Sequence, residues 1–86
     1  MSGGVLRITQ LETVAGAVLR VEGRLVGAWV NELRQACEGH SARMLDLRGL
    51  QTVDVEGLML LRQLALDGIE LEHLSGYLTA LLEDRR

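Results

Sequence analysis

The chain has 86 residues, of which 48% are hydrophobic and 24% are charged, and its formal net charge at pH 7 is −3. This composition is typical of one small globular domain and excludes an intrinsically disordered chain. There is no basic cluster before Arg85-Arg86, and the two aromatic residues, Trp29 and Tyr77, are too few for a base-stacking platform. The net charge and the low aromatic content therefore exclude nucleic acid as an expected partner.

The cysteine count and the apolar runs indicate the compartment. The single cysteine, Cys37, excludes an internal disulfide and fits a reducing environment. The first ten residues lack the pattern of a signal peptide, and no apolar run approaches the roughly 18 residues that a membrane span needs. We expect a cytoplasmic protein without direct membrane insertion, with one domain over residues 1–86, a flexible N-terminus at 1–4 and a polar tail at 83–86.

The first third of the chain predicts a β-hairpin. Alternating apolar residues predict a strand over Val5–Thr9, in which Leu6 and Ile8 face the same way, and a second strand over Ala17–Glu22. A turn over Thr13–Gly16 joins the two strands.

A helix is expected next, from about Ala28 to Glu38, with Gly39 ending it. It has one apolar face and one polar face, and the apolar spacing is typical of a helix that lies on a sheet. Trp29 is interpreted either as core or as an exposed binding anchor. The other apolar positions are Val30, Leu33, Ala36 and Cys37.

The stretch Met44–Leu66 organises the rest of the chain. Met44–Leu47 predicts a short buried strand, and a turn follows, with Gly49 and the polar pair Gln51-Thr52. Asp54 is a natural N-cap for an apolar helix, because its carboxylate can accept the unpaired amide hydrogens of the first turn. Gly57 lies just inside this helix despite its poor helix propensity, which indicates that another group passes close by.

The last third predicts a strand and a helix. Asp67-Gly68 supplies a helix stop, and Ile69–Glu72 alternates as a fourth strand with Ile69 and Leu71 inward. Ser75 then caps a short helix. Its expected buried face consists of Tyr77, Leu78, Leu81 and Leu82.

The whole pattern predicts an α/β fold, with a small mixed sheet of about four strands and about three helices packed against it. The strand Leu45-Asp46-Leu47, the turn and the D-x-x-G sequence Asp54–Gly57 at the start of a leucine-rich helix resemble the STAS domain. Gly23-Arg24-Leu25 before the first helix also fits that family, and the resemblance covers roughly Val5 to Leu82. The chain is similar to the short, stand-alone bacterial members, since it lacks the further strand and helix of longer STAS domains.

The resemblance implies a non-enzymatic protein-interaction module similar to the anti-sigma factor antagonists, which act in signalling and transcription regulation. In those proteins the start of the second helix and the preceding loops dock on an ATP-binding anti-sigma kinase. One alternative is an accessory STAS subunit of an ABC lipid transporter, which contacts the ABC ATPase. A third is a STAS domain that binds a nucleotide or a lipid, and a homodimer through an uncovered apolar sheet face is also considered. The partner-binding residues expected from the resemblance are Asp54, Val55, Glu56, Gly57, Leu58, Arg24, Leu25, Val26 and Arg62.

The phosphorylation switch of the antagonists is absent from this sequence. Their motif is D-S-S-G, and its first serine is phosphorylated; here Val55 and Glu56 occupy the two serine positions. Valine has no hydroxyl, so no phosphorylation is expected at this site. Glu56 either imitates a phosphate in part, with one charge against about −1.5 to −2, or simply interacts with the helix dipole. Asp54 either belongs to such a site or is a cap and nothing more.

Arg24 and Arg62 are interpreted either as solvated surface residues or as contacts to a partner or an anionic ligand.

Residues suited to catalysis do not form a recognisable set. Cys37 is expected in the core, and His40 in a solvated loop. His73 follows the fourth strand, and Glu70 and Glu72 share one outward strand face. No zinc spacing and no phosphate-binding glycine loop is present, so we expect no enzyme activity, metal or cofactor.

Overall fold

A computed structural model describes residues 6–83, so the expected flexible start, the predicted strand residue Val5 and the last three residues of the tail lie outside it. The described chain forms a mixed α/β fold, with five strands in one sheet and three helices. In chain order the elements are β1 (Leu6–Thr13), β2 (Gly16–Leu25), α1 (Trp29–His40), β3 (Met44–Asp46), β4 (Leu50–Val53), α2 (Val55–Leu66), β5 (Glu70–Glu72) and α3 (Gly76–Glu83).

The predicted hairpin is confirmed, and both of its strands are longer than expected. β1 and β2 pair antiparallel from Leu6↔Gly23 to Thr13↔Gly16, which leaves Val14 and Ala15 at the tip. The hydroxyl of Thr13 accepts a hydrogen bond from the amide of Ala15 and donates one to the carbonyl of Gly16. These bonds close the turn within its own four residues.

β2 is the central strand, and two further strands share its second edge. β3 pairs in parallel with Val18–Arg20 of β2, and β4 pairs in parallel with the Gly23–Leu25 end. β5 then pairs in parallel with β3. The turn predicted with Gly49 and the pair Gln51-Thr52 is confirmed only at Gly49, because Leu50–Val53 forms β4.

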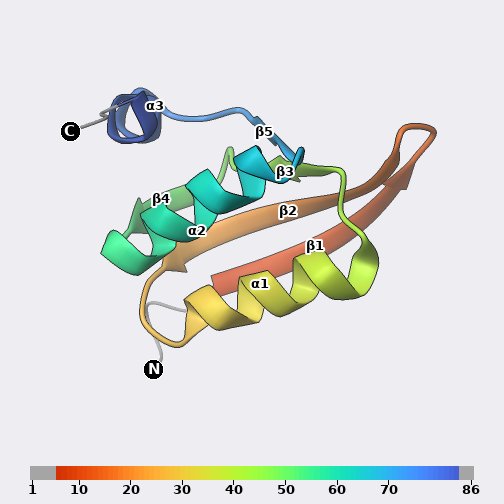
Figure 1. The fold of residues 1–86 in the computed structure, drawn as a ribbon, viewed down its shortest axis with the longest axis horizontal. Coiled ribbons are helices and arrows are strands. Elements are labelled where there is room, and N and C mark those ends of the chain that lie inside the picture. Colours follow the sequence, from red (N-terminus) through yellow and green to blue (C-terminus); the bar gives the residue numbers. More distant parts are fainter. Residues whose placement is uncertain (1–5, 84–86) are drawn as a thin grey trace.

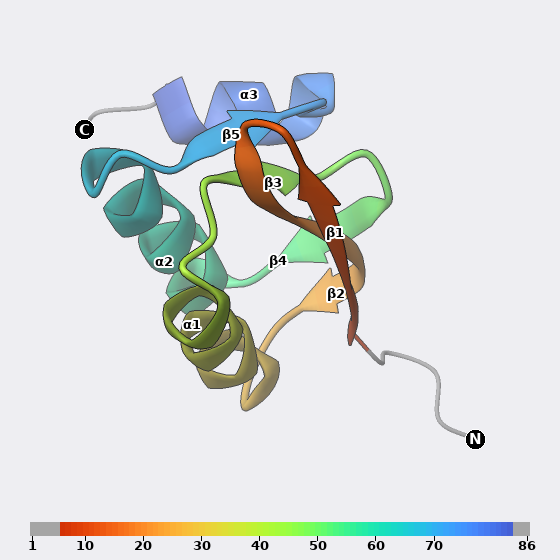
Figure 2. The same ribbon diagram turned by 90° about the vertical axis from the view of Figure 1, so that its right-hand side faces the viewer.

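The sheet is covered on one face. α1 and α2 lie side by side on that face, whereas α3 lies along the edge of the sheet formed by β4 and β5 (Figures 1 and 2). Alternation along β2 places Leu19 and Val21 under the helices, where both are fully buried, and places Arg20 on the opposite face. The hairpin tip and the start of α2 lie at opposite ends of the molecule (Figure 1).

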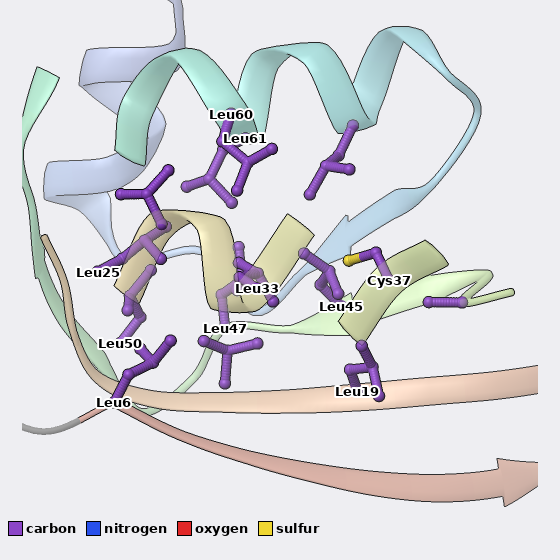
Figure 3. Packing of buried hydrophobic residues seen from close by; sticks show 14 of the residues in the cluster. Leu6, Leu19, Leu25, Leu33, Cys37, Leu45, Leu47, Leu50, Leu60 and Leu61 are labelled. Atoms are coloured by element: carbon purple, nitrogen blue, oxygen red, sulfur yellow. The ribbon is translucent and has the colours of Figure 1, made fainter. Parts of the chain in front are cut away.

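The hydrophobic core lies between the sheet and the helices. Leucines of the sheet face leucines of α1 and α2, and Cys37 lies among them (Figure 3). The expectation that Cys37 belongs to the core is confirmed, since only 4% of it is exposed. Trp29 is half-buried against the same cluster, and α1 packs through Val30, Leu33 and Cys37 as its spacing predicted.

Two details of the helices differ from expectation. α1 continues through Gly39 to His40, and Ser41 in the left-handed conformation ends it, so His40 is an exposed helical residue and not a loop residue. In α3, Leu78 is fully buried as expected, but Tyr77 is 53% exposed. The helix is short and lies at the sheet edge, so only one side of it meets the core.

Candidate functional site

The start of α2 and the loop between β2 and α1 meet at Asp54. The Oδ1 atom of Asp54 accepts a hydrogen bond of 2.8 Å from the amide of Gly57, as expected of an N-cap. Its Oδ2 atom accepts a second bond, of 2.9 Å, from the amide of Gly27. The predicted cap is therefore confirmed, and the same carboxylate also holds the preceding loop.

A backbone bond strengthens this junction. The amide of Asp54 donates to the carbonyl oxygen of Leu25 at 3.2 Å, where β4 ends beside β2. Hydrogen bonds from the amides of Gly27 and Gly57 lower the pKa of Asp54 below its ordinary value of 3.8, because amide donors stabilise the ionised carboxylate. Asp54 is thus charged at neutral pH and lies at the positive end of the α2 dipole.

Gly57 is buried where α2 crosses the end of β2. A Cβ atom added at Gly57 would lie 2.5 Å from the carbonyl oxygen of Leu25, which is closer than any real contact of this kind. The close approach predicted from this glycine is confirmed, and the group that approaches is backbone. The first turn of α2 therefore lies directly against the strand.

The exposed and half-buried residues around this junction form what we term the Asp54 surface. Val55 is 72% exposed, Glu56 is exposed and Leu58 is half-buried in the first turn of α2. Leu25 and Gly57 are buried, so they shape the surface through packing and do not present side chains to a partner. The Asp54 surface consists of Arg24, Val26, Asp54, Val55, Glu56 and Leu58.

Arg62 lies apart from this surface, further along α2. It is half-buried, and its guanidinium donates a hydrogen bond of 2.8 Å to the carbonyl oxygen of Leu81 in α3. The interpretation of Arg62 as simply solvated is therefore wrong, because the side chain links two helices. Arg24 is exposed at the end of β2, as a surface residue would be.

Sequence reasoning missed two components of the site. Gly27 provides an amide to Asp54, and its φ of 59° lies in the left-handed region that favours glycine. Nothing in the spacing of Gly27 and Asp54 reveals that they meet. β4 pairs Thr52 with Arg24 and Val53 with Leu25, but its sequence Leu50-Gln51-Thr52-Val53 does not alternate between apolar and polar residues, so it carries no clear strand signal.

A second polar cluster lies on the uncovered face of the sheet, at the end of β3. Asp46, whose side chain is 11% exposed, forms an ion pair of 3.5 Å with Arg20 and accepts a 3.1 Å hydrogen bond from the amide of Arg48. The guanidinium of Arg48 lies 3.1 Å from the Nε2 atom of His73. Since arginine has no acceptor, Nε2 accepts this bond.

The charge of Asp46 is well compensated. Desolvation alone would raise the pKa of Asp46, but the hydrogen bond from the Arg48 amide and the electrostatic effect of the nearby His73, Arg48 and Arg20 side chains outweigh it, so the pKa is lowered. Glu70 and Glu72 pair with Met44 and Asp46 in register, next to this cluster. The arrangement stabilises a buried carboxylate at the strand end.

Residues suited to nucleophilic or metal chemistry are dispersed in the structure. Burial, and then the charge of Glu38, raise the pKa of the Cys37 thiol to about 11, so it is protonated at neutral pH. Between residues 6 and 83, no three histidine, cysteine or acidic side chains are grouped so as to hold a metal ion.

No protein-family model matches the chain, and no curated protein matches it significantly. None of the helices in the described part is long and apolar enough to cross a membrane. Fold and geometry together define a small α/β domain with a carboxylate-clamped helix start at one end of its sheet.

Proposed function

We propose that this protein is a cytoplasmic protein-interaction module of the STAS type, which docks on an ATPase related to the anti-sigma kinases through the Asp54 surface. The docking regulates the partner and, through it, transcription. The chain itself supplies no catalysis in this proposal.

The clamp at Asp54 is the observation that carries the proposal. Its carboxylate bonds Gly57 of α2 and Gly27 of the β2–α1 loop at once, at 2.8 Å and 2.9 Å. Both segments are thereby fixed as one rigid surface, and a preorganised surface loses less entropy on binding. The element order, with a D-x-x-G turn opening the helix after a parallel strand, also supports the STAS assignment.

Regulation by phosphorylation at this surface is not part of the proposal. Val55 is exposed at the first helical position and has no hydroxyl. Glu56 places a constant negative charge in the same turn, where the helix dipole favours it. Partner docking is therefore expected to be constitutive with respect to this motif.

The structure favours a protein partner over a small ligand. A pocket between α1 and α2 has an apolar floor that includes Cys37, Leu60 and Leu64, and it measures about 190 Å³. A second, open hollow measures about 340 Å³, and three of its four lining residues are charged: Arg20, Glu22 and Arg48, with Gly49. Small-molecule sites usually measure about 300–1,000 Å³ and are mostly apolar, so the first pocket is small for such a site and the second is too polar. The Asp54 surface, by contrast, presents the exposed side chains of Arg24, Val55 and Glu56, a mixture of charged and apolar groups that suits a protein contact.

Affinity purification with matched variants tests the proposal. Tagged wild type is purified from its native host beside Arg24→Glu, Glu56→Lys and the control Val14→Lys, and co-purifying proteins are identified by mass spectrometry. Val14 is fully exposed at the hairpin tip, at the far end of the molecule (Figure 1). We expect wild type and the control to retain an anti-sigma kinase or a related ATPase that the two surface variants lose.

The other outcomes are equally informative. Equal retention by all four proteins would place docking elsewhere and contradict the role of the Asp54 surface. Recovery of an ABC ATPase would replace transcription control with transport. Circular dichroism of each variant checks that the fold is intact.

A further inference from the structure

The outer edge of β1 has no strand partner among residues 6–83. β1 is the end strand of the sheet and pairs only with β2, in an unbroken register from Leu6↔Gly23 to Thr13↔Gly16 (Figures 1 and 2). Every second residue of such an edge strand directs its N–H and C=O groups away from the sheet. These groups can form a further ladder with another strand.

The usual devices that block an open edge are absent from β1. The strand has eight residues, contains no proline or lysine, and has no bulge in its pairing with β2. Its two charged residues, Arg7 and Glu12, lie near its two ends, so the middle of the edge is neutral. At the opposite edge of the sheet, α3 lies along β4 and β5. One edge is therefore covered, and the other is available for pairing.

We propose that a second copy of this chain pairs with the β1 edge, so that two antiparallel β1 strands join the two sheets about a two-fold axis. The same edge is used on both chains, as a two-fold interface requires. The axis is perpendicular to the sheet, so both copies keep their helices on the same side. Residues opposite each other then lie on the same face of the sheet, which centres the pairing on one residue and not between two.

The side chains favour the register centred on Thr9, in which residues 6–12 of each chain are paired. Thr9 is exposed on the uncovered face and lies opposite Thr9 of the second copy, a pair whose hydroxyls can form a hydrogen bond. Ile8 is half-buried on the covered face and lies opposite Gln10 of the second copy. The neighbouring register, centred on Gln10, would instead place Ile8 opposite the charged Glu12. Packing therefore favours Thr9 as the centre.

No like charges face each other in this register. Arg7 lies opposite Leu11 of the second copy, and in its own chain Arg7 is paired with Glu22 of β2, which balances its charge. The aliphatic stem of Arg7 can therefore cover Leu11, which is half-buried on the same face. The edge is thus complementary to itself in hydrogen bonding, in charge and in the apolar groups that it covers.

The expected dimer is weak. Seven paired residues extend about 23 Å at about 3.3 Å per residue, so this contact buries less surface than a standard interface of about 1,600 Å². We expect a dissociation constant of roughly 100 µM. The pairing uses none of the residues of the Asp54 surface, so this proposal does not depend on the proposed function.

Sedimentation equilibrium with purified protein tests the dimer. We compare wild type, Thr9→Lys, Thr9→Glu and the control Val14→Lys up to about 1 mM, ten times the expected dissociation constant. Wild type and the control, whose substitution lies at the hairpin tip outside the pairing, should form dimers. Each Thr9 variant alone should remain monomeric with unchanged circular dichroism, because like charges meet at the centre of the ladder. An equal mixture of the two Thr9 variants should dimerise again, because opposite charges then meet.

The other outcomes contradict the proposal. A monomeric wild type would overturn the dimer and leave the proposed function standing. Dimers of either Thr9 variant alone, or a mixture that stays monomeric, would show that Thr9 is not at the centre of the contact.

Cross-linking tests the register directly. Thr9→Cys and Glu12→Cys proteins are treated separately with a short bis-maleimide; Cys37 is buried and should react slowly. In the proposed register the two position-9 side chains adjoin, whereas the two position-12 side chains lie six residues apart, about 20 Å along the strands. Cross-linked dimers are expected for Thr9→Cys and not for Glu12→Cys. Cross-links at position 12, or at neither position, would overturn the register.

Discussion

Asp54 acts through its side-chain carboxylate and Gly57 through its lack of a side chain, and both therefore tolerate little change. Asp54 bonds two amides, and Gly57 admits the carbonyl of Leu25. The cap was predictable because it arises from neighbours in the chain, and the close approach was predictable because glycine is unfavourable inside a helix. That the approaching group is the carbonyl of Leu25 was not predictable. The role of Gly27 was not predictable, because it depends on how two segments 27 positions apart are brought together by the sheet.

Replacing Gly57 with alanine should destabilise the fold by about 1–3 kcal/mol, since the new Cβ meets a backbone oxygen that cannot move independently of β2. Gly39→Ala is the matched control: it lies in α1 with no atom within 4 Å of its added Cβ, and should stabilise by about 0.5–1 kcal/mol. Urea unfolding followed by Trp29 fluorescence measures both. Equal effects of the two substitutions would show that α2 can shift outward freely.

Asp54→Asn should lower the melting temperature at neutral pH, because an amide offers one acceptor oxygen where the carboxylate offers two. The folded-state pKa of Asp54 is lowered, so its contribution to stability is present above 3.8 and is lost as the pH falls through the folded value. The difference between wild type and variant should therefore shrink as the pH is lowered from about 7 to about 3. Melting curves over this range measure it, and a constant difference would mean that the charge of Asp54 contributes nothing.

At the scale of elements, α2 is central, because it contacts the sheet, α1 and α3. Its boundaries were predictable from Asp54 and Asp67-Gly68, which supply local start and stop signals. β4 was not predicted, since a four-residue strand that follows a glycine resembles a turn until its pairing with β2 is known. The exposure of Tyr77 was missed for a related reason: periodicity places a residue on a helix face but does not say how much of that face is covered.

The link from α2 to α3 gives a prediction about local stability. Arg62→Met keeps an apolar stem and removes the donor to Leu81, so α3 should open more often while the rest of the fold is retained. Hydrogen exchange should accelerate in residues 76–83 and stay unchanged in α1. Arg34→Met serves as control, because Arg34 is exposed and bonds Asn31 within its own helix. Similar protection of α3 in both variants would show that packing of Leu78 alone holds it.

At the scale of the whole molecule, the two faces of the sheet differ in character. The covered face is built of leucine and valine, and the uncovered face carries the polar cluster around Asp46 and Arg20. Local alternation predicted this division, and the α/β class followed from the order of the elements. The order of strands across the sheet did not follow, because it depends on which crossovers return beside β2.

The pairing pattern also has a consequence for the order in which the chain folds. β1 and β2 meet across a two-residue turn, whereas β3 and β4 pair with β2 only after the chain has passed through α1, and β5 pairs with β3. Closing short loops is faster than closing long ones, so we expect the hairpin to form early and to serve as the template for the later strands. During synthesis each later strand would therefore emerge from the ribosome after its pairing partner: β2 after β1, β3 and β4 after β2, and β5 after β3.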